Sequence, residues 1–510
     1  MTPSTSKTSR YREVERKFDV VESTVAPSFE GLSAVARVER SPSQRLDAIY
    51  FDTPGHDLAA NHVTLRRRTG GPDAGWHLKL PDGPDARTEV RAPLADDAAE
   101  ADVDADAVPQ DLLDIVGAIV RNRPVRPVAH ITTERTVDVL CGLDGAPLAE
   151  FCDDQVTAWA GHDGAEQQWR EWELELAEDA EDATPDLLER LANRLLDAGA
   201  VPAGHGSKLA RVLDNAAGDA DDADEAEPDA GPVEPMHRAV AEQVDQLLVW
   251  DRAVRANAYD SVHQMRVTTR KIRSLLQSSE GAFGISDGAW ILDELRQLAS
   301  VLGVARDAEV LAERYERALD DLPEDLVRGR VRQRLVEGAK RRYDAGLRRA
   351  LIAMRSERYF RLLDALDGLV AAEPPPLRPG EEPAKVTIDS AYKRVRKAAK
   401  AAAHAADDDR DEALHRIRKG AKRLRYTAAA TGADRVSDRA KTIQTLLGDH
   451  QDSVVSRTHL SQQAEAAHAA GEDTFTYGLL YQQEDDLARG ARQQLDAALK
   501  KLDKSVRNAH

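Results

Sequence analysis

Apolar and polar positions alternate in short runs through residues 11–175 of this 510-residue chain. The clearest runs are "HVTLRRRTG", "GWHLKL", "ARTEVRA", "ITTERTVDVL" and "WREWELELA", and Gly, Pro and Asp separate them. Successive side chains of a strand point to opposite faces, so a period of two is typical of half-buried strands. The pattern predicts an antiparallel β domain in this part of the chain.

From about residue 236 onward, the apolar positions recur at helical spacing, which predicts an all-helical second half. Residues 184–198 read as one helix, with a Pro in the first turn and a Gly after the end. Residues 213–235 are acidic and hold almost no large apolar side chains, so we expect a disordered linker there. A Pro-rich break at 371–385 divides the helical half in two.

The two pieces of the helical half, about 236–370 and 386–508, repeat each other. "VHQMRVTTRKIRSLL" at 262–276 aligns with "LHRIRKGAKRLRYTA" at 414–428. Downstream, "LGVARD" aligns with "LGDHQD", which places Asp307 against Asp452. A repeat of this kind implies one helical unit used twice, packed with pseudo-two-fold symmetry.

Each predicted strand carries charge on one face and apolar side chains on the other. In "EVERKFDV", Glu13, Glu15 and Lys17 share a face opposite Val14 and Phe18. The charged positions of the later strands are Arg66, Arg68, Lys79, Arg87, Glu89, Arg91, Arg135, Glu171, Glu173 and Glu175. A solvated outer face explains one such strand. The whole series favours a closed sheet with a charged interior and its apolar faces outward, under helices.

An interior with both signs of charge suits a polyanion that is held together with a divalent metal. Cations neutralise phosphate oxygens, and carboxylates hold Mg²⁺ or Mn²⁺, which bridges to the same oxygens. In the helical half, His263, Arg266, Arg270 and Arg273 form one basic stripe, with Met265, Thr269 and Ile272 on the opposite side. The second repeat has the same stripe, formed by His415, Arg418, Lys422 and Arg425. The high arginine content suits multidentate phosphate binding.

The composition of the chain limits which cellular compartment and which binding partners can be expected. The net charge of −20 argues against a generic nucleic-acid binder, and the few aromatic side chains do not alternate with the basic ones. Cys141 and Cys152 are the only cysteines, so no disulfide framework is implied. The first residues lack the apolar core of a signal peptide, and no apolar run reaches the length of a membrane span. We expect a cytoplasmic protein without nucleic-acid or membrane partners, and its oligomeric state stays open.

The segments "EVERK", "YFDTPGHDLAANHVTLRRRTG", "HLKL", "RTEV", "WELEL" and "GSKLAR" occur in the order shown by the CYTH superfamily, the triphosphate tunnel metalloenzymes. Residues 8–212 resemble that domain. The resemblance implies an eight-stranded antiparallel tunnel with outer helices, so that the whole chain would be an α+β multidomain protein. It also implies metal-dependent hydrolysis of inorganic triphosphate or short polyphosphate, with Mg²⁺ or Mn²⁺ as the cofactor.

The resemblance assigns roles to individual residues of the tunnel. It implies a catalytic set of Glu13, Glu15 and Lys17. The implied phosphate ligands are Lys17, Arg66, Arg68, Lys79, Arg87, Arg135 and Lys208. The implied metal ligands are Glu13, Glu15, Asp154, Glu171, Glu173 and Glu175. Glu89 would orient a neighbouring cation, and Glu171, near one end of its strand, could instead be a charge at the tunnel mouth.

The helical half, residues 236–510, resembles the CHAD domain, the conserved-histidine α-helical domain, through "VHQMRVTTRKIR" and "LHRIRKGAKRLRY". This resemblance implies a pair of four-helix bundles that bind inorganic polyphosphate, and it allows for association with polyphosphate granules. The implied polyphosphate ligands are His263, Arg266, Arg270, Lys271, Arg273, His415, Arg418, Lys419, Lys422, Arg423 and Arg425. The two histidines could be phosphate donors, metal ligands or packing residues.

Three alternatives to an inorganic triphosphatase remain. The tunnel could have lost turnover, which would leave a protein that only binds or localises polyphosphate. It could cyclise adenylate or hydrolyse thiamine triphosphate, although the strands show no site for a base or ring. A nucleic-acid binder is disfavoured by the net charge and the lack of stacking aromatics.

Overall fold

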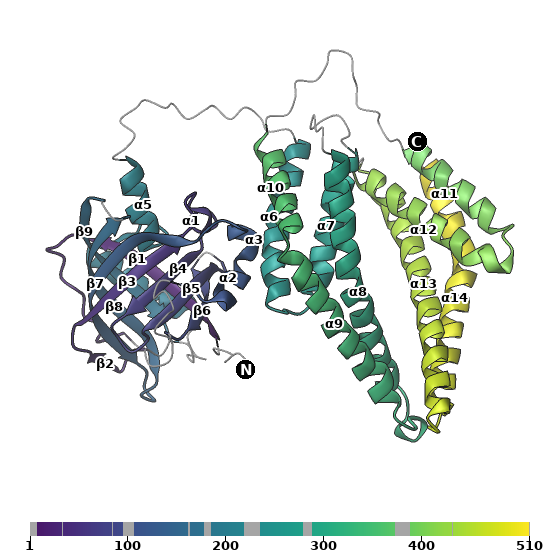
Figure 1. Ribbon diagram of the computed structural model, residues 1–510, viewed down its shortest axis with the longest axis horizontal. Coiled ribbons are helices and arrows are strands. Elements are labelled where there is room, and N and C mark those ends of the chain that lie inside the picture. The colour runs from purple at the N-terminus through teal and green to yellow at the C-terminus, as the bar shows by residue number, and fades with distance from the viewer. Residues whose placement is uncertain are drawn as a thin grey trace, which may run out of the picture. The chain divides into compact units, whose positions relative to one another are not determined.

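The computed structural model describes the chain in ten stretches and divides it into two compact units. The described residues are 8–32, 34–83, 85–94, 107–161, 164–177, 185–218, 235–278, 288–372, 388–430 and 432–508. The first unit, called the N-terminal unit below, comprises Met1–Leu275 and Ala353–Ala371. The second, the C-terminal unit, comprises Leu276–Ile352 and Ala372–His510. Figure 1 labels most of the helices and strands of both units.

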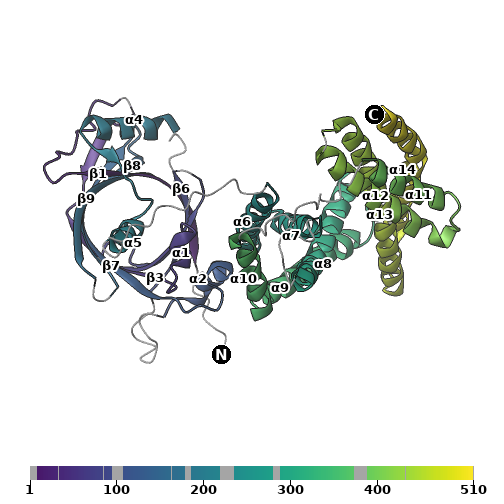
Figure 2. The same ribbon diagram turned by 90° about the horizontal axis from the view of Figure 1, so that it is seen from above.

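An antiparallel barrel forms the first half of the N-terminal unit. Eight strands follow one another around it in the order β1, β6, β5, β4, β3, β7, β8, β9, and β9 pairs with β1 to close the ring. Seen from above, the strands enclose a circle (Figure 2). The strands are β1 (Ser9–Val20), β2 (Arg37–Arg40), β3 (Gln44–Asp52), β4 (Thr64–Thr69), β5 (Gly75–Pro81), β6 (Ala86–Ala92), β7 (Arg126–Cys141), β8 (Pro147–Ala160), β9 (Glu166–Leu176) and β10 (Val201–Pro202). The short β2 extends the sheet beside β7, and β10 lies beside β1.

Helices cover the apolar outer face of the barrel, as the alternation of the strands requires. On one side, α4 (Pro185–Asp197) packs Leu191 and Leu195 against Trp172 and Leu174 of β9. On another side, α1 (Asp57–Ala60), α2 (Gln110–Ile115) and α3 (Gly117–Val120) cover the outward residues of β4, β5 and β6. Because the apolar faces are satisfied outside, the inward faces are left to the charged residues.

One end of the barrel is filled by the helix α5 (Lys208–Gly218). Leu209 and Val212 of α5 are buried in an apolar cluster that includes Tyr50, Ile131 and Val156. Ile131 and Val156 lie on the same strand faces as Arg135 and Asp154, so this cluster occupies the inside of the barrel. The interior is therefore apolar at the α5 end and charged beyond it.

Helices α6 (Pro235–Arg255) and α10 (Glu357–Ala371), and α7 (Ser261–Ser278) as far as Leu275, complete the N-terminal unit. Polar contacts join α6 and α10 to the helices beside the barrel. Arg121, which follows α3, makes ion pairs with Asp364 and Asp367 of α10. Arg255 of α6 donates a hydrogen bond of 3.0 Å to the carbonyl of Asp114 in α2.

The C-terminal unit is all helical in its described residues. Its elements are α8 (Gly288–Asp320), the short turn η1 (Glu324–Leu326), the π-helical segment η2 (Gln333–Glu337), α9 (Gly338–Met354), α11 (Ile388–Ala402), α12 (Asp407–Ala430), α13 (Asp434–Ala469) and α14 (Phe475–Arg507). The last two residues of α9, after Ile352, belong to the N-terminal unit. Helices α11 to α14 form a four-helix bundle around a shared core, in which Val395, Ile417, Ile443 and Leu502 are each buried.

A pair of partly buried polar contacts reflects the repeat within the C-terminal unit. Arg314 of α8 pairs with Glu484 of α14. His459 of α13 accepts a hydrogen bond of 2.8 Å from Arg342 of α9. His459 stands 145 residues after Arg314, the same interval that separates the aligned Asp307 and Asp452. Arg314 of α8 and His459 of α13 therefore occupy equivalent positions of the repeat, and each contacts a residue of the other repeat.

The predicted fold class is confirmed: a closed eight-stranded antiparallel barrel with outer helices precedes an all-helical region. The predicted helix at 184–198 is α4. The linker prediction was wrong at its start, because α5 continues to Gly218 and packs inside the barrel, whereas residues 219–234 lie outside the described residues. Most of the break at 371–385 also lies outside them. No helix in the described ranges is long and apolar enough to cross a membrane.

Candidate functional site

A charged cavity of about 530 Å³ occupies the barrel between α5 and the turns at the opposite end of the strands. It brings together most of the predicted tunnel residues. Those that line it are Glu13, Glu15, Lys17, Arg66, Arg68, Lys79, Arg87, Glu89, Arg135, Glu173, Glu175 and Lys208. The two-residue alternation of the strands therefore gave the correct inward face for every one of these strand positions.

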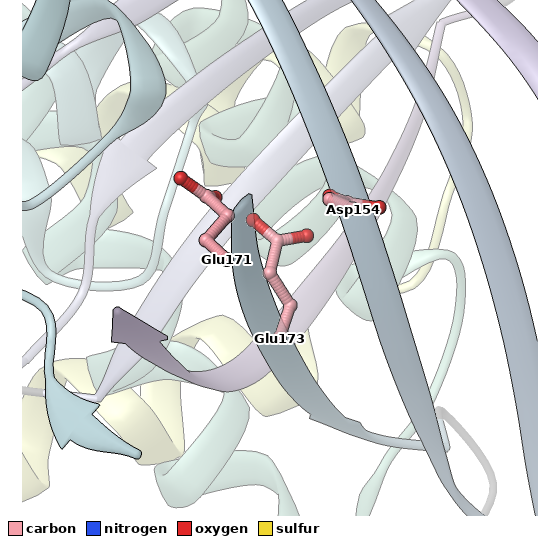
Figure 3. A group of neighbouring side chains, drawn as sticks. All are labelled: Asp154, Glu171 and Glu173. Atoms are coloured by element: carbon pink, nitrogen blue, oxygen red, sulfur yellow. The ribbon is translucent and has the colours of Figure 1, made fainter. Parts of the chain in front are cut away.

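At the α5 end, three buried carboxylates meet around one ammonium group. Asp154 comes from β8, and Glu171 and Glu173 come from the neighbouring β9, as Figure 3 shows. Their oxygens lie within 4.8 Å of one another. Lys208 Nζ lies 2.9 Å from Asp154, 2.7 Å from Glu171 and 2.8 Å from Glu173. We call this group the carboxylate cluster.

The carboxylate cluster has the chemistry of a site for a hard divalent cation. Carboxylate oxygens are the ligands that Mg²⁺ and Mn²⁺ prefer. All three side chains are buried, so their negative charges require a compensating cation, and the ammonium of Lys208 supplies one here. Glu13, Glu15 and Glu175 lie outside this group, so the structure separates the predicted metal ligands into two sets. Glu171 belongs to the cluster rather than to the tunnel mouth.

Glu13 and Glu15 of the second set are paired with lysines along the wall. Lys79 Nζ lies 2.6 Å from Glu13, and Lys17 Nζ lies 2.5 Å from Glu15. Lys17 also reaches Glu173 at 3.2 Å, so it connects the wall to the carboxylate cluster. Because the charges alternate in sign along the wall, an anion and a metal ion can both be accommodated by shifts of the lysine and arginine side chains.

Burial and neighbouring charges shift the acidities in the tunnel. Burial opposes the ionisation of Glu15, but Lys17 and Lys79 outweigh it and lower its pKa to about 2. For Glu175, burial dominates and raises the pKa to about 7, with Glu13 and Glu15 adding to the effect of burial. Burial together with the charges of Arg66 and Arg135 lowers the pKa of Arg68 to about 9. Arg68 also makes an ion pair with Asp73, in the turn between β4 and β5.

Arg135 joins the two strands that form the carboxylate cluster. It donates to Asp154 at 2.8 and 2.6 Å, and it also pairs with Glu173. Burial opposes the ionisation of both acids. Arg135 and Lys208 nevertheless hold the pKa of Asp154 below its ordinary value. Lys17, Lys208 and Arg135 hold the pKa of Glu173 well below its ordinary value. Asp154 and Glu173 are therefore ionised at neutral pH.

Two residues that face the inside of the tunnel, His77 and Tyr50, were not predicted from the sequence. His77 is buried on the same face as Lys79, and its Nδ1 lies 2.9 Å from Glu89. Burial lowers the pKa of His77 to about 4, so the ring is neutral near pH 7. Tyr50 accepts a hydrogen bond of 3.2 Å from Arg66. The period-two rule would have found His77 from its position two residues before Lys79, and it would have found Tyr50 in the strand "QRLDAIYFD".

The two basic stripes lie on α7 and α12, as predicted. On α7, Met265, Thr269 and Ile272 are buried, while Arg270 and Lys271 are exposed. On α12, Leu414, Ile417 and Leu424 are buried. In the second stripe His415 is exposed and Arg418, Lys422 and Arg425 are half-buried, while the neighbouring Lys419 and Arg423 are exposed. Arg425 donates a hydrogen bond of 3.2 Å to Gln444. Burial and the charges of Lys419 and Arg418 lower the pKa of His415.

Comparison with protein families gives one match for each half of the chain. Residues 11–199 match the model of the CYTH domain, and residues 238–461 match the model of the CHAD domain. Two relatives from Mycobacterium tuberculosis are each 67% identical over 515 residues and cover 98% of both chains. They are "Uncharacterized protein MT2285" of strain CDC 1551 / Oshkosh and "Uncharacterized protein Rv2226" of strain ATCC 25618 / H37Rv.

Two solved structures are each similar to part of the chain. PptA from Streptomyces chartreusis is 19% identical, with 52% of this chain and 98% of that chain covered at a TM-score of 0.42. The CHAD domain from the plant Ricinus communis is 26% identical, with 52% of this chain and 90% of that chain covered at a TM-score of 0.40.

Proposed function

Because the chain belongs to the proteins in which a CYTH domain is followed by a CHAD domain, we propose that its barrel hydrolyses inorganic triphosphate or short polyphosphate. CYTH domains are often triphosphatases or cyclases and form a metalloenzyme family, and they bind triphosphate substrates. The helical part would bind polyphosphate and supply chain ends to the barrel, or localise the enzyme to polyphosphate granules in the cytoplasm.

The observation that carries this proposal is the carboxylate cluster at the end of a cation-lined cavity. Asp154, Glu171 and Glu173 offer a divalent metal three hard oxygen ligands. Arg66, Arg68, Lys79, Arg87 and Arg135 offer phosphate oxygens several donors along the wall. An inorganic chain of phosphates needs both at once, and it needs no apolar surface for a base or ring.

The residues of the tunnel would position the chain and balance its charge. Asp154, Glu171 and Glu173 would hold a divalent metal, which would supply charge neutralisation and lower the pKa of a water bound to it. Arginines and lysines of the wall bind the non-bridging oxygens and hold the chain in line. In the reaction, the water oxygen bonds to phosphorus and the bridging P–O bond breaks. The electron pair stays with the leaving phosphate oxygen, and the released proton passes to solvent.

Lys208 would have to move when a metal binds, because its ammonium lies where the three carboxylates converge. It is the first residue of α5, so a small shift at the start of that helix would carry it toward the phosphates of the wall. Lys208 would then act as a phosphate ligand, the function implied by the sequence resemblance.

One assay tests the proposal directly. Phosphate release is measured in parallel from triphosphate, longer polyphosphate and ATP, with Mg²⁺, with Mn²⁺ and with neither. We expect metal-dependent release that is fastest from triphosphate or short chains, and we expect Glu13→Gln and Glu15→Gln to remove it while the thermal unfolding midpoint is kept. Binding without turnover would instead favour a protein that only binds polyphosphate. Turnover confined to ATP would favour a nucleotide-directed activity.

A further inference from the structure

The charged cavity is closed at the end where the carboxylate cluster lies. Leu209 and Val212 of α5 fill the barrel there, in an apolar cluster with inward-facing residues of β3, β7 and β8. The cavity extends from Lys208 to Pro72, Asp73 and Ala146 in the turns at the opposite end of the strands. A phosphate chain can therefore enter from the end with these turns, but it cannot thread past α5.

This geometry creates a problem for the product. If a chain enters from the open end, its terminal phosphate arrives first at the carboxylate cluster. The orthophosphate cut from that terminus then lies between α5 and the remaining chain. It can leave only after the shortened chain has withdrawn, unless the wall has a second opening near the cluster.

The wall is interrupted at such a place, along one edge of β1. On that edge β1 pairs with β6 up to Val14, opposite Ala86, and with β10 from Phe18, opposite Pro202. Residues 15–17 lie between the two ladders, where Glu15 N–H donates to the carbonyl of Asp85 and Ala203 N–H donates to the carbonyl of Lys17, both at 3.0 Å.

A second cavity, of about 370 Å³, lies against this interruption, and we call it the side cavity. Asn193 and Leu196 of α4 and the segment 202–206 line it from outside. It shares Glu15, Lys17 and Arg87 with the charged cavity. The two cavities are therefore separated by the side chains of those three residues.

The side cavity meets the tunnel at the level of the carboxylate cluster. Lys17 Nζ lies 3.2 Å from Glu173 Oε1, and Gly206 precedes Lys208 by two residues. Arg87 closes the passage with a hydrogen bond to the carbonyl of Gly206. Arg87 is also a phosphate ligand in the proposed function, so an orthophosphate can replace that carbonyl as its partner.

The charges around the side cavity balance. Its lining cations are Arg16, Lys17 and Arg87, and its lining acids are Glu15, Asp85 and Glu189. The outer acids are already bound, since Arg16 pairs with Asp85 at 3.0 Å and with Glu189 at 2.8 Å. A balanced lining does not hold an anion as strongly as the arginines of the tunnel do, which suits passage rather than storage.

We propose that the side cavity is the exit through which the barrel releases orthophosphate while the shortened chain stays bound. The proposal rests on the proposed hydrolysis in the tunnel. Arg87 breaks its contact with Gly206, accompanies the orthophosphate past Lys17, and closes again on the next chain terminus. A chain can then advance by one phosphate at a time without leaving the tunnel.

The test blocks the side cavity from outside without touching the tunnel residues. Asn193 is exposed on α4 and lines the side cavity, so Asn193→Cys offers a thiol at its entrance. The chain's own Cys141 and Cys152 are each only 2% exposed, so a bulky maleimide should react with the new thiol alone. The matched control is Asp197→Cys, which is exposed on the same helix and does not line the side cavity.

Two readouts separate cleavage from release. Acid quenching reports total cleaved phosphate, and a phosphate-binding fluorescent sensor reports only free phosphate. With the Asn193→Cys protein carrying the maleimide, we expect a burst of cleaved phosphate followed by release slowed about ten-fold, equivalent to about 1.4 kcal/mol on the barrier. A small methylating thiol reagent at the same cysteine, and the maleimide at Asp197→Cys, should leave release unchanged.

Chain length gives a second outcome. On long polyphosphate, the unmodified protein should shorten one chain repeatedly before it takes another, whereas the blocked protein should release the chain after each cleavage. If the blocked protein shows no burst and the same release rate as its control, orthophosphate leaves by another route and the proposal is wrong. If the unmodified protein releases no phosphate from any substrate, the proposed function fails, and the exit fails with it.

Discussion

The barrel and the helix α12 both gather lysines and arginines, but they place them in opposite surroundings. In the barrel, Lys79 and Arg135 point inward and are held by carboxylates at 2.6–2.8 Å. On α12, Lys419 and Arg423 are exposed. Buried charges are strong and little screened, and they are costly unless paired. Exposed charges are screened by salt and adapt to their ligand. The barrel therefore suits a short chain of fixed geometry with a metal, and the exposed cations of α12 suit a long flexible polyanion.

The largest test of this contrast is to remove one charge from the carboxylate cluster. Glu173→Gln deprives Lys17, Arg135 and Lys208 of a shared partner and removes a metal ligand. We expect triphosphate hydrolysis to fall about 100- to 1000-fold, the loss typical for one preorganised electrostatic group. Polyphosphate binding by the helices should not change. The measurement is kcat/KM with saturating metal, with Glu166→Gln, on the same strand but exposed, as the control.

The second test removes a stripe and should weaken binding but not hydrolysis. Replacing Arg266, Arg270 and Arg273 with Ala, or Arg418, Lys422 and Arg425 with Ala, removes three cations from one helix. We expect the Kd for long polyphosphate to rise about 10- to 100-fold, equivalent to about 1.4–2.7 kcal/mol. Binding of long chains to the unchanged protein should weaken as salt is added. If either triple variant binds long chains like the unchanged protein, the two stripes do not act on one ligand.

The third test uses the pH dependence of stability at a buried histidine of the C-terminal unit. Burial and Arg342 lower the pKa of His459 to about 4 from its ordinary value of 6.5. Its neutral form contributes stability above pH 6.5, and this contribution is lost as the pH falls toward 4. Relative to His459→Gln, the unchanged protein should lose about 3 kcal/mol more of its free energy of unfolding between pH 7 and pH 4. Denaturant unfolding of both proteins, followed by circular dichroism, measures this difference, and parallel curves would contradict it.

The smallest effect is expected for a cation on the outer face of the barrel. Arg67 lies between Arg66 and Arg68 on β4, and alternation turns it away from the tunnel. Arg67→Gln should change kcat/KM for triphosphate less than about two-fold, a surface effect within about 0.5 kcal/mol. Arg66→Gln on the same strand is the matched comparison and should lower it strongly. Equal losses for the two variants would show that the two faces of β4 are not distinguished by function.

The alternation of charged and apolar residues was sufficient to predict which side chains of each strand face the barrel interior, because a period of two depends only on neighbouring residues. It could not show that Glu171 and Glu173 meet Asp154 while Glu13 and Glu15 pair with lysines. That division depends on α5, which brings Lys208 to one end of the barrel only. Lys208, the first residue of α5, was recognised through "GSKLAR", but no helix was predicted there. Residues 213–218 were assigned to the linker, because the acidic segment begins inside the helix.

The side cavity could not be predicted from the sequence at all. Its lining comes from β1, the turn before β6, α4 and the segment 202–206, which no short-range pattern connects. The pairing of Arg314 with Glu484 and of His459 with Arg342 was hidden for the same reason. The repeat predicted equivalent helices, but the equivalent positions carry different residue types.

The pairing of β1 with β9 also determines how slowly the barrel can be assembled. Lys17 pairs with Glu173, which lies 156 residues later in the chain, and Glu15 comes to lie opposite Glu175. Contacts of such long sequence separation slow folding, because loop entropy is lost before the contact is gained. Until β9 has been synthesised, β1 keeps one edge without a partner, and an unpaired edge can recruit strands from other chains. Newly made chains are therefore most prone to aggregate during the interval between the synthesis of β6 and that of β9.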